Sequence, residues 1–337
     1  MTPSDQNRTL PCALDTSKPN VAGAYDYLFG GKDHFAADRE LAERLLAIYP
    51  GARQMVRENR WFLARALNSM PGQAISRYVD LGAGLPTRPA VHDIVRRQDT
   101  AAAVLYVDND PMVISHLQAL ACTSGSRVEA LTADLAASAA VLGHAREAGL
   151  ADLDEPVCLI LAMALHFYPA ADARNLVAEY AGELARGSYV IITVRRGQET
   201  IGQQITRAYD AATLYNHGHD EVVSFFPGLD LIPPGITDAR AWTPGWATPA
   251  PFHDRAGQVL GSGPSRDHDQ YRGARCRRRP WSSSPSTGEG WSPDGRSATP
   301  LVRRAVSCMT AKLPGRAATQ GSMPAALMPG SIVCGAR

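Results

Sequence analysis

The chain has 337 residues, which is enough for one large domain or two ordinary ones. Hydrophobic residues make up 45% and charged residues 20% of it, so wholesale disorder is excluded. The six cysteines are scattered without a C-x-x-C pair, and the longest apolar run, residues 157–165, is less than half a membrane span. The sequence therefore predicts a cytoplasmic protein with no disulfide framework and no membrane segment.

Two helical patterns occupy the first 70 residues. Residues 35–49 and 53–70 carry apolar or alanine side chains at helical spacing, and each run stops at a Pro-Gly pair. Before them, a segment around a glycine pair is rich in aromatic side chains: Tyr25, Tyr27, Phe29 and Phe35. Two interpretations stay open for this segment. It closes over a ligand bound at the sheet, or its aromatic side chains only pack the first helix onto the sheet.

Residues 75–246 alternate short apolar runs with helical patterns. Strands are predicted at residues 78–81, 104–107, 128–132, 157–162 and 189–194, and helices at residues 89–97, 111–121, 138–148 and 172–185. Continuous apolar strands separated by helices are typical of a parallel sheet that is covered on both faces. Because crossovers are right-handed, the predicted fold is α/β with a doubly wound, Rossmann-like sheet.

The remaining residues, 247–337, have a different composition. Proline, glycine and serine account for 32 of these 91 residues, and the segment carries a net charge of +8 against −7 for residues 1–246. Such a composition rarely buries enough apolar surface to offset chain entropy, so we expect a disordered tail. Translation of a GC-rich gene in the wrong frame is a second hypothesis for it. The arginine run at residues 275–279 raises the alternative of nucleic-acid binding, although an unselected arginine run explains it better.

The first predicted strand ends in a glycine-bearing turn, Asp80-Leu-Gly-Ala-Gly-Leu-Pro-Thr87. Gly82 and Gly84 let the backbone turn tightly and approach a ligand closely. A dinucleotide fingerprint would place a third glycine where Thr87 stands, which disfavours the alternative of an NAD-dependent oxidoreductase. Asp80 at the strand end suits a ligand that carries a cation, and a plain strand-to-helix turn is the other interpretation.

The second and third strands also end in carboxylates. Asp108 comes 24 residues after Gly84, about where a carboxylate accepts hydrogen bonds from ribose hydroxyls. Asp110, directly before a proline, is predicted to cap the next helix. At the third strand, Asp134 either accepts a hydrogen bond from an adenine amino group, with Leu135 covering the ring, or caps the following helix.

These motifs resemble the class I S-adenosylmethionine-dependent methyltransferases, and more closely an actinobacterial methyltransferase family long catalogued as a domain of unknown function. The resemblance covers about residues 19–246 and rests on residues 25–35, 57–63, 80–87, 106–111 and 165–168 in that order. It implies a seven-stranded sheet with an antiparallel last strand and S-adenosyl-L-methionine across the tips of the first strands. We expect the cofactor-binding residues to be Asp80, Gly82, Ala83, Gly84, Asp108, Asn109, Asp134, Leu135, Tyr27, Gly31, Arg60 and Met163.

Three further sites remain open. His166 follows the fourth strand, where a methyltransferase places residues near the reacting methyl group, and is either a general base or a structural histidine. Arg60 is either a partner for the cofactor carboxylate or an exposed helix arginine. His217 and His219 lack further ligands at suitable spacing, so no metal site is predicted.

The chain departs from the family in two places. No closing antiparallel strand is recognisable after residue 246, so we expect that strand to be missing. Residues 193–196 differ from the segment that the family usually carries there, which leaves the contacts to the acceptor open. The predicted organisation is an N-terminal lid segment and helices in residues 1–70, a cofactor-binding methyltransferase domain in residues 71–246 and the tail. Because residues 1–246 are acidic and show no basic groove, a small-molecule acceptor fits better than nucleic acid. A cofactor-binding remnant without turnover is the alternative from a different class.

Overall fold

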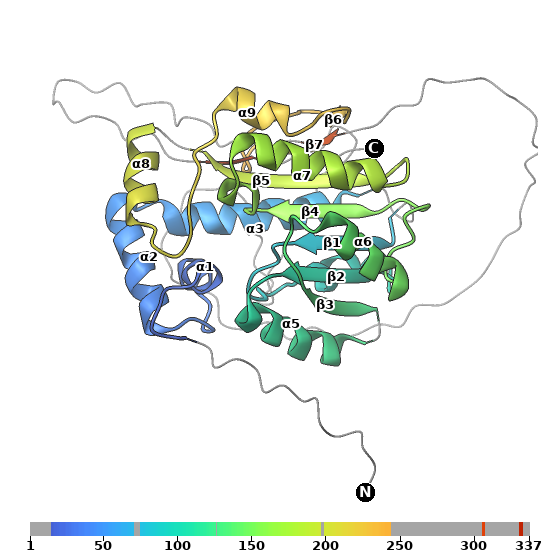
Figure 1. Cartoon of the computed structure of the whole chain (residues 1–337), viewed down its shortest axis with the longest axis horizontal. Helices are drawn as coiled ribbons and strands as arrows, with labels where there is room; N and C mark the ends of the chain where they lie inside the picture. The colour runs from blue at the N-terminus through green and yellow to red at the C-terminus, as the bar shows by residue number, and fades with distance from the viewer. Residues whose placement is uncertain are drawn as a thin grey trace, which may run out of the picture. The chain divides into compact units, whose positions relative to one another are not determined.

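Five parallel strands form the centre of the fold (Figure 1). They lie in the order β3-β2-β1-β4-β5 and comprise β1 (Arg77–Leu81), β2 (Ala103–Asp108), β3 (Val128–Thr132), β4 (Cys158–Ala162) and β5 (Tyr189–Arg196). Val79 of β1 pairs with Leu105 on one side and with Leu159 on the other. The chain thus winds outward from β1 to β3 and then returns to β4, which confirms the predicted doubly wound α/β sheet. The point where the order reverses, between β1 and β4, is where such sheets bind ligands.

The computed structural model describes residues 15–70, 75–125, 127–196, 199–243, 305–306 and 330–332. Most of the predicted tail, residues 247–337, lies outside the described residues, and so does the arginine run at residues 275–279. The described part of the tail consists of β7 (Ala305–Val306) and β8 (Gly330–Ile332).

An antiparallel strand does join the sheet. β8 pairs with β5, with Val194 opposite Ile332 and Arg196 opposite Gly330. The expectation of a missing antiparallel strand is corrected by this pairing. Three residues within a segment rich in proline, glycine and serine are too few to show a strand period, which is why the pattern did not reveal it. In a separate sheet, β6 (Leu231–Ile232) pairs in parallel with β7.

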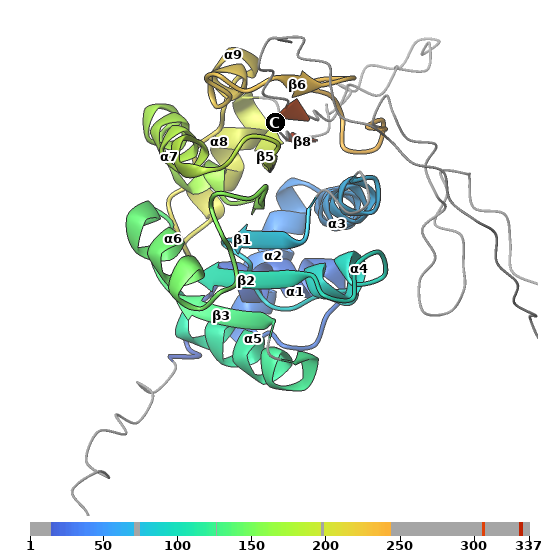
Figure 2. The same cartoon turned by 90° about the vertical axis from the view of Figure 1, so that its right-hand side faces the viewer.

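Helices cover both faces of the sheet. Figure 2 shows α3 and α4 on one face and α6 and α7 on the opposite face. The helices of the described residues are α1 (Val21–Phe29), α2 (Ala36–Ile48), α3 (Ala52–Asn68), α4 (Val91–Val95), α5 (Pro111–Ser124), α6 (Ser138–Glu147), α7 (Ala170–Glu183), α8 (Glu199–Ala208) and α9 (His219–Ser224), with a short 3-10 helix η1 (Leu165–Phe167). None of them is long and apolar enough to cross a membrane.

Local sequence signals set the helix ends nearest the sheet tips. The Asp110 carboxylate accepts hydrogen bonds from the backbone N–H groups of Met112 and Val113, at 2.7 and 3.4 Å, so the predicted helix cap is confirmed. At the start of α1 the Asn20 side chain accepts from Ala22 at 2.7 Å. These caps fix where α5 and α1 begin, next to the ends of β2 and β1.

Two clusters of buried hydrophobic side chains in the described part of the chain bear on the site. The first core lies between the sheet and helices α6, α7 and α9, with Leu81, Leu159 and Val177 fully buried in it. A second core holds α1, α2, the start of α3 and α8 together, through residues such as Leu41 and Ile205. Figure 1 shows α1, α2 and α8 beyond the carboxyl ends of the strands. The helices of the second core therefore stand opposite the edge at which β1, β2 and β4 end.

Candidate functional site

A cavity of about 400 Å³ lies at the carboxyl ends of β1, β2 and β4. It is lined by helices α1 and α3 on one side and by the strand tips on the other. Nine of the residues predicted to bind a cofactor line it: Arg60, Asp80, Gly82, Ala83, Gly84, Asp108, Asn109, Leu135 and Met163. Because parallel strands end at the same edge, residues scattered over 100 positions of the sequence are brought to one place.

The glycine turn after β1 has a backbone that only glycine adopts easily. Gly82 has φ +69° and Gly84 has φ +64°, both in the left-handed region. The N–H of Gly82 donates to the Val107 carbonyl at 2.8 Å, which ties the turn to β2. A Cβ atom at Gly82 would lie 3.1 Å from the Cβ of Ala164. The turn is thus close-packed on the Gly82 side, while a Cβ built on Gly84 meets no atom of the described residues within 4 Å beyond its chain neighbours.

Asp108 holds this turn from the neighbouring strand. Its Oδ2 accepts from the N–H of Gly84 at 3.0 Å and its Oδ1 accepts from the N–H of Asp110 at 3.0 Å. Burial raises the pKa of the Asp108 carboxyl, and the two backbone donors oppose that rise. Each oxygen retains a lone pair. The carboxylate is therefore fixed at the cavity and able to accept hydrogen bonds from a ligand.

Asp80 is the most deeply buried acid of the cavity, with 4% of its surface exposed. Burial raises its pKa to about 7, the Arg60 charge opposes the rise, and the Asp108 charge adds to it. Near neutral pH this carboxyl is poised between its two protonation states. A cation placed beside it would favour the ionised form.

Asn59 of α3 and Tyr25 of α1 form a polar pair that was not among the predicted cofactor-binding residues. The Nδ2 of Asn59 donates to the Tyr25 hydroxyl at 2.9 Å, and both residues line the cavity. The Oδ1 of Asn59 is buried and has no hydrogen-bond partner among the described residues. Such an acceptor calls for a ligand donor or an ordered water. The only sequence signal was a polar Asn-Arg pair within an apolar helix pattern.

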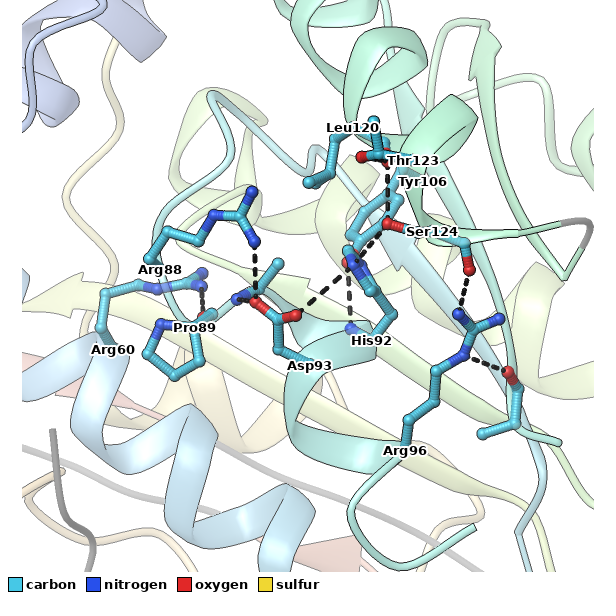
Figure 3. Close-up of polar contacts among 12 residues, drawn as sticks. Arg60, Arg88, Pro89, His92, Asp93, Arg96, Tyr106, Leu120, Thr123 and Ser124 are labelled. Carbon is cyan, nitrogen blue, oxygen red and sulfur yellow. Dashed lines mark hydrogen bonds and ion pairs between the residues drawn. The ribbon is translucent and has the colours of Figure 1, made fainter. Parts of the chain in front are cut away.

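A second network anchors α4 behind the cavity (Figure 3). The Tyr106 hydroxyl accepts from the backbone N–H of His92 at 3.1 Å and lies 2.9 Å from its Nδ1, while the Nε2 lies 2.9 Å from the Ser124 Oγ. Tyr106 stands opposite Asp80 in the β1–β2 register. The buried imidazole thus links α4, β2 and α5. In the same view Arg60 reaches the Pro89 carbonyl at 3.4 Å, which joins α3 to the segment before α4.

Three residues predicted to bind a cofactor lie away from the cavity lining. The Tyr27 hydroxyl donates to Glu43, and the Arg53 guanidinium stacks 4.6 Å from the Tyr27 ring centre. Gly31 packs against Asp26, to whose carbonyl its N–H donates at 2.8 Å. Tyr27 and Gly31 therefore make their contacts with other residues of the N-terminal helical segment.

The third of these residues, Asp134, supports the turn before α6. Its Oδ1 accepts from the N–H of Ala136 at 2.9 Å and from the Tyr168 hydroxyl at 3.3 Å. Tyr168 itself lines the cavity. Asp134 therefore touches the cavity wall through Tyr168, and its contact with Ala136 lies in the turn before α6, whose N-cap is Ala137 without a side-chain cap hydrogen bond.

A smaller cavity of about 90 Å³ adjoins the first. The two share four lining residues, among them Tyr25 and Met163. Met163 has φ +61°, and its N–H donates to the carbonyl and the hydroxyl of Thr193 at 2.9 and 2.8 Å. A left-handed non-glycine residue costs backbone energy and is concentrated at functional sites. Met163 therefore marks the boundary between the two cavities.

The predicted catalytic residue, His166, lines the smaller cavity and is 5% exposed. Burial lowers its pKa well below the ordinary range, and the charges of Arg195 and His217 lower it further. The imidazole is therefore neutral near pH 7, and its buried Nδ1 has no partner within the described ranges. His217, whose Nε2 lies 3.2 Å from the Leu165 carbonyl, is buried beside the same helix. In the part of the chain that the structure describes, no group of His, Cys, Asp and Glu side chains is arranged to hold a metal ion.

Several solved structures are similar to this chain, and two of them are more than 30% identical to it. A candidate methyltransferase from Thermobifida fusca YX is 32% identical over 72% of this chain and 92% of its own, with a TM-score of 0.65. A protein of the DUF574 family from Streptomyces avermitilis is 31% identical over 69% and 91%, with a TM-score of 0.63. A family model described as S-adenosyl methyltransferase matches residues 7–264, and no curated protein matches. The matched residues include all the described residues that line the two cavities.

Proposed function

The chain belongs to the S-adenosyl methyltransferase family, and from this premise we propose that it methylates a small-molecule acceptor at the junction of its two cavities. It is an S-adenosylmethionine-dependent enzyme, and that cofactor supplies an electrophilic methyl group on a positively charged sulfur. The observation that carries the proposal is the placement of Asp80, Asp108 and the glycine turn in one cavity at the carboxyl edge of the sheet. Residues 1–246 are acidic, which supports a small acceptor over nucleic acid.

The lining of the larger cavity suits each part of S-adenosylmethionine. Left-handed Gly82 and Gly84 let the methionyl part approach the backbone closely, and Asp80 offers a carboxylate to its cationic groups. We assign Asp108 to the ribose hydroxyls, because its oxygens are held in place and still accept. Leu135 offers an apolar surface for the adenine ring. The unpartnered Oδ1 of Asn59 is matched to a donor such as the methionyl ammonium.

The smaller cavity is assigned to the acceptor. It meets the larger one at Met163, so an acceptor held there faces the cofactor across that residue. Methyl transfer is an in-line displacement, and holding the two reactants in line supplies much of the rate. His166 is neutral and lines this cavity, so it can accept a proton from a protonated nucleophile. We also propose a cytoplasmic location, where thiols stay reduced, because the cysteines are scattered along the sequence.

Calorimetric titration of the full chain tests the proposal. S-adenosylmethionine is titrated first, and NAD is titrated into the same preparation as the control. Saturable binding of S-adenosylmethionine alone is the expected result. Binding of NAD alone, or of neither ligand by a folded protein, would refute it, and the second outcome would favour a cofactor-binding fold that has lost its ligand.

A further inference from the structure

A buried arginine projects from β5 into the smaller cavity. Arg195 lies two residues after Thr193, on the same face of the strand, and is 3% exposed. Its Nε, Nη1 and Nη2 atoms are all buried and have no hydrogen-bond partner among the described residues. A guanidinium has five N–H donors and stays charged at neutral pH. A buried charge without a partner lowers the free energy of unfolding of the protein, and a ligand that supplies the partner removes this cost.

The cavity around Arg195 provides no counter-charge. Its described lining contains no Asp or Glu, and most of it is aliphatic or aromatic: Val21, Leu28, Leu45, Val56, Phe167 and Leu214. Burial lowers the Arg195 pKa to about 10, and burial also raises the pKa of Tyr209, so the Tyr209 hydroxyl is neutral near pH 7 and supplies no counter-charge. The arginine therefore remains a cation at neutral pH in apolar surroundings. Its missing partner is an anion.

The second unpartnered polar atom lines the same cavity. The Nδ1 of His166 is buried without a partner in the described part of the chain, and Arg195 lies near enough to lower the pKa of this histidine. Two buried polar groups on one small apolar cavity are the pattern of a ligand site in which a few polar atoms fix the orientation of an apolar body. The site is shaped for one end of a ligand.

We propose that the methyl acceptor is a small carboxylic acid with an apolar body, whose carboxylate pairs with Arg195 in the smaller cavity. This inference rests on the proposed methyltransferase function. A guanidinium binds a carboxylate through two parallel N–H···O bonds, which a neutral amide cannot reproduce. A dry cavity of about 150 Å³ is known to take a benzene ring, so about 90 Å³ holds the carboxylate and a short apolar stem. The rest of the acceptor extends past Met163 toward the cofactor, and the carboxylate is its anchor.

Ligand-observed NMR on the full chain saturated with S-adenosylhomocysteine tests this inference. The probes are butanoate, benzoate and phenylacetate, each compared with its neutral amide. We expect at least one acid to bind saturably and its amide to bind at least about ten-fold more weakly. In Arg195→Met this preference should fall to less than about two-fold, whereas the affinity for S-adenosylmethionine stays at the wild-type value.

Arg60→Met is the matched control, because Arg60 lines only the larger of the two cavities. It should keep the preference for acids and weaken S-adenosylmethionine binding.

Equal binding of acids and amides, or no binding of any probe at up to about 10 mM by protein that binds S-adenosylmethionine, would overturn the inference. An acid preference that survives in Arg195→Met would overturn it as well. Loss of S-adenosylmethionine binding in Arg195→Met alone would assign Arg195 to the cofactor carboxylate instead. Failure of the wild-type chain to bind S-adenosylmethionine counts against the proposed function. The comparison of acid with amide uses only the wild-type protein, so it tests the inference even where a variant does not fold.

Discussion

The Asn59 side chain donates to the Tyr25 hydroxyl across 2.9 Å, and this bond joins α3 to α1 at the wall of the larger cavity. It orients the amide so that Nδ2 is used within the protein while Oδ1 stays buried without a partner among the described residues. The N-terminal helices therefore do more than cover the sheet, because they present a fixed acceptor to the place assigned to the cofactor.

Replacing this acceptor should weaken cofactor binding. We predict that Asn59→Leu lowers the affinity for S-adenosylmethionine by roughly 1–2 kcal/mol, since the side chain keeps its volume and loses Oδ1. Tyr25→Phe, which removes the hydroxyl and leaves the amide, should have a smaller effect. Calorimetry on both variants checks the order. An Asn59→Leu protein that folds and binds like the wild type would remove Asn59 from the site.

Cofactor affinity should depend on pH through Asp80. Its pKa of about 7 means that the carboxyl of the free protein is mostly protonated below pH 7. A bound cation favours the ionised form, so affinity should rise as the pH rises through about 7, by up to about ten-fold per unit below it. In Asp80→Asn the rise should disappear and the affinity should be low throughout. Titrations from about pH 6 to pH 7.5 measure the slope. A flat profile in the wild type would contradict the assignment.

The buried guanidinium of Arg195 should lower the free energy of unfolding of the protein. Because its buried guanidinium has no partner within the described residues, we predict that Arg195→Met raises the free energy of unfolding by about 1–4 kcal/mol. Arg96→Met is the comparison, because Arg96 donates to the Ala102 carbonyl at 3.1 Å and to the Ser124 carbonyl. That variant should be less stable than the wild type. Denaturant unfolding in the absence of ligand measures both, and a loss of stability in Arg195→Met would mean that the arginine is satisfied in the free protein.

The imidazole of His92 should be important for stability and of little importance for chemistry. His92→Ala leaves the Tyr106 hydroxyl and the Ser124 hydroxyl without their shared partner and opens a cavity, so we expect a loss of about 2–4 kcal/mol. Ser124→Ala should cost less than half of this, since it opens no large cavity and removes only the two contacts of the Ser124 Oγ, with the His92 Nε2 and the Leu120 carbonyl. Thermal unfolding of the two variants gives the comparison. Similar losses for both would show that the network does not converge on His92.

The sequence predicted the parts of the fold that follow from local pattern. The five parallel strands are mostly apolar, and Asp110 before a proline is a short-range cap signal. Parallel strands end at one edge, which is why Asp80 and Asp108 could be placed together before any contact was known. The pairing of β8 could not be predicted, because three residues show no period.

The site residues that escaped prediction depend on packing between distant elements. Asn59 and Tyr25 meet only because α1 packs on α3, and Arg195 lines a cavity built mainly by the N-terminal helices. Tyr27 was predicted to bind the cofactor because it lies in the N-terminal motif. Tyr25 and Tyr27 are two residues apart in one helix, so their side chains point in directions that differ by about 200°. Tyr25 consequently lines the cavity and Tyr27 faces Arg53.

The central claim is that the cavity at the ends of β1 and β2 holds S-adenosylmethionine with Asp108 on the ribose. Calorimetric titration of Asp108→Ala tests it most directly, with Asp154→Ala, an exposed aspartate outside the cavity lining, as the control. We predict a loss of roughly 1–3 kcal/mol in Asp108→Ala and no change in Asp154→Ala. Wild-type affinity in a folded Asp108→Ala protein would contradict the claim.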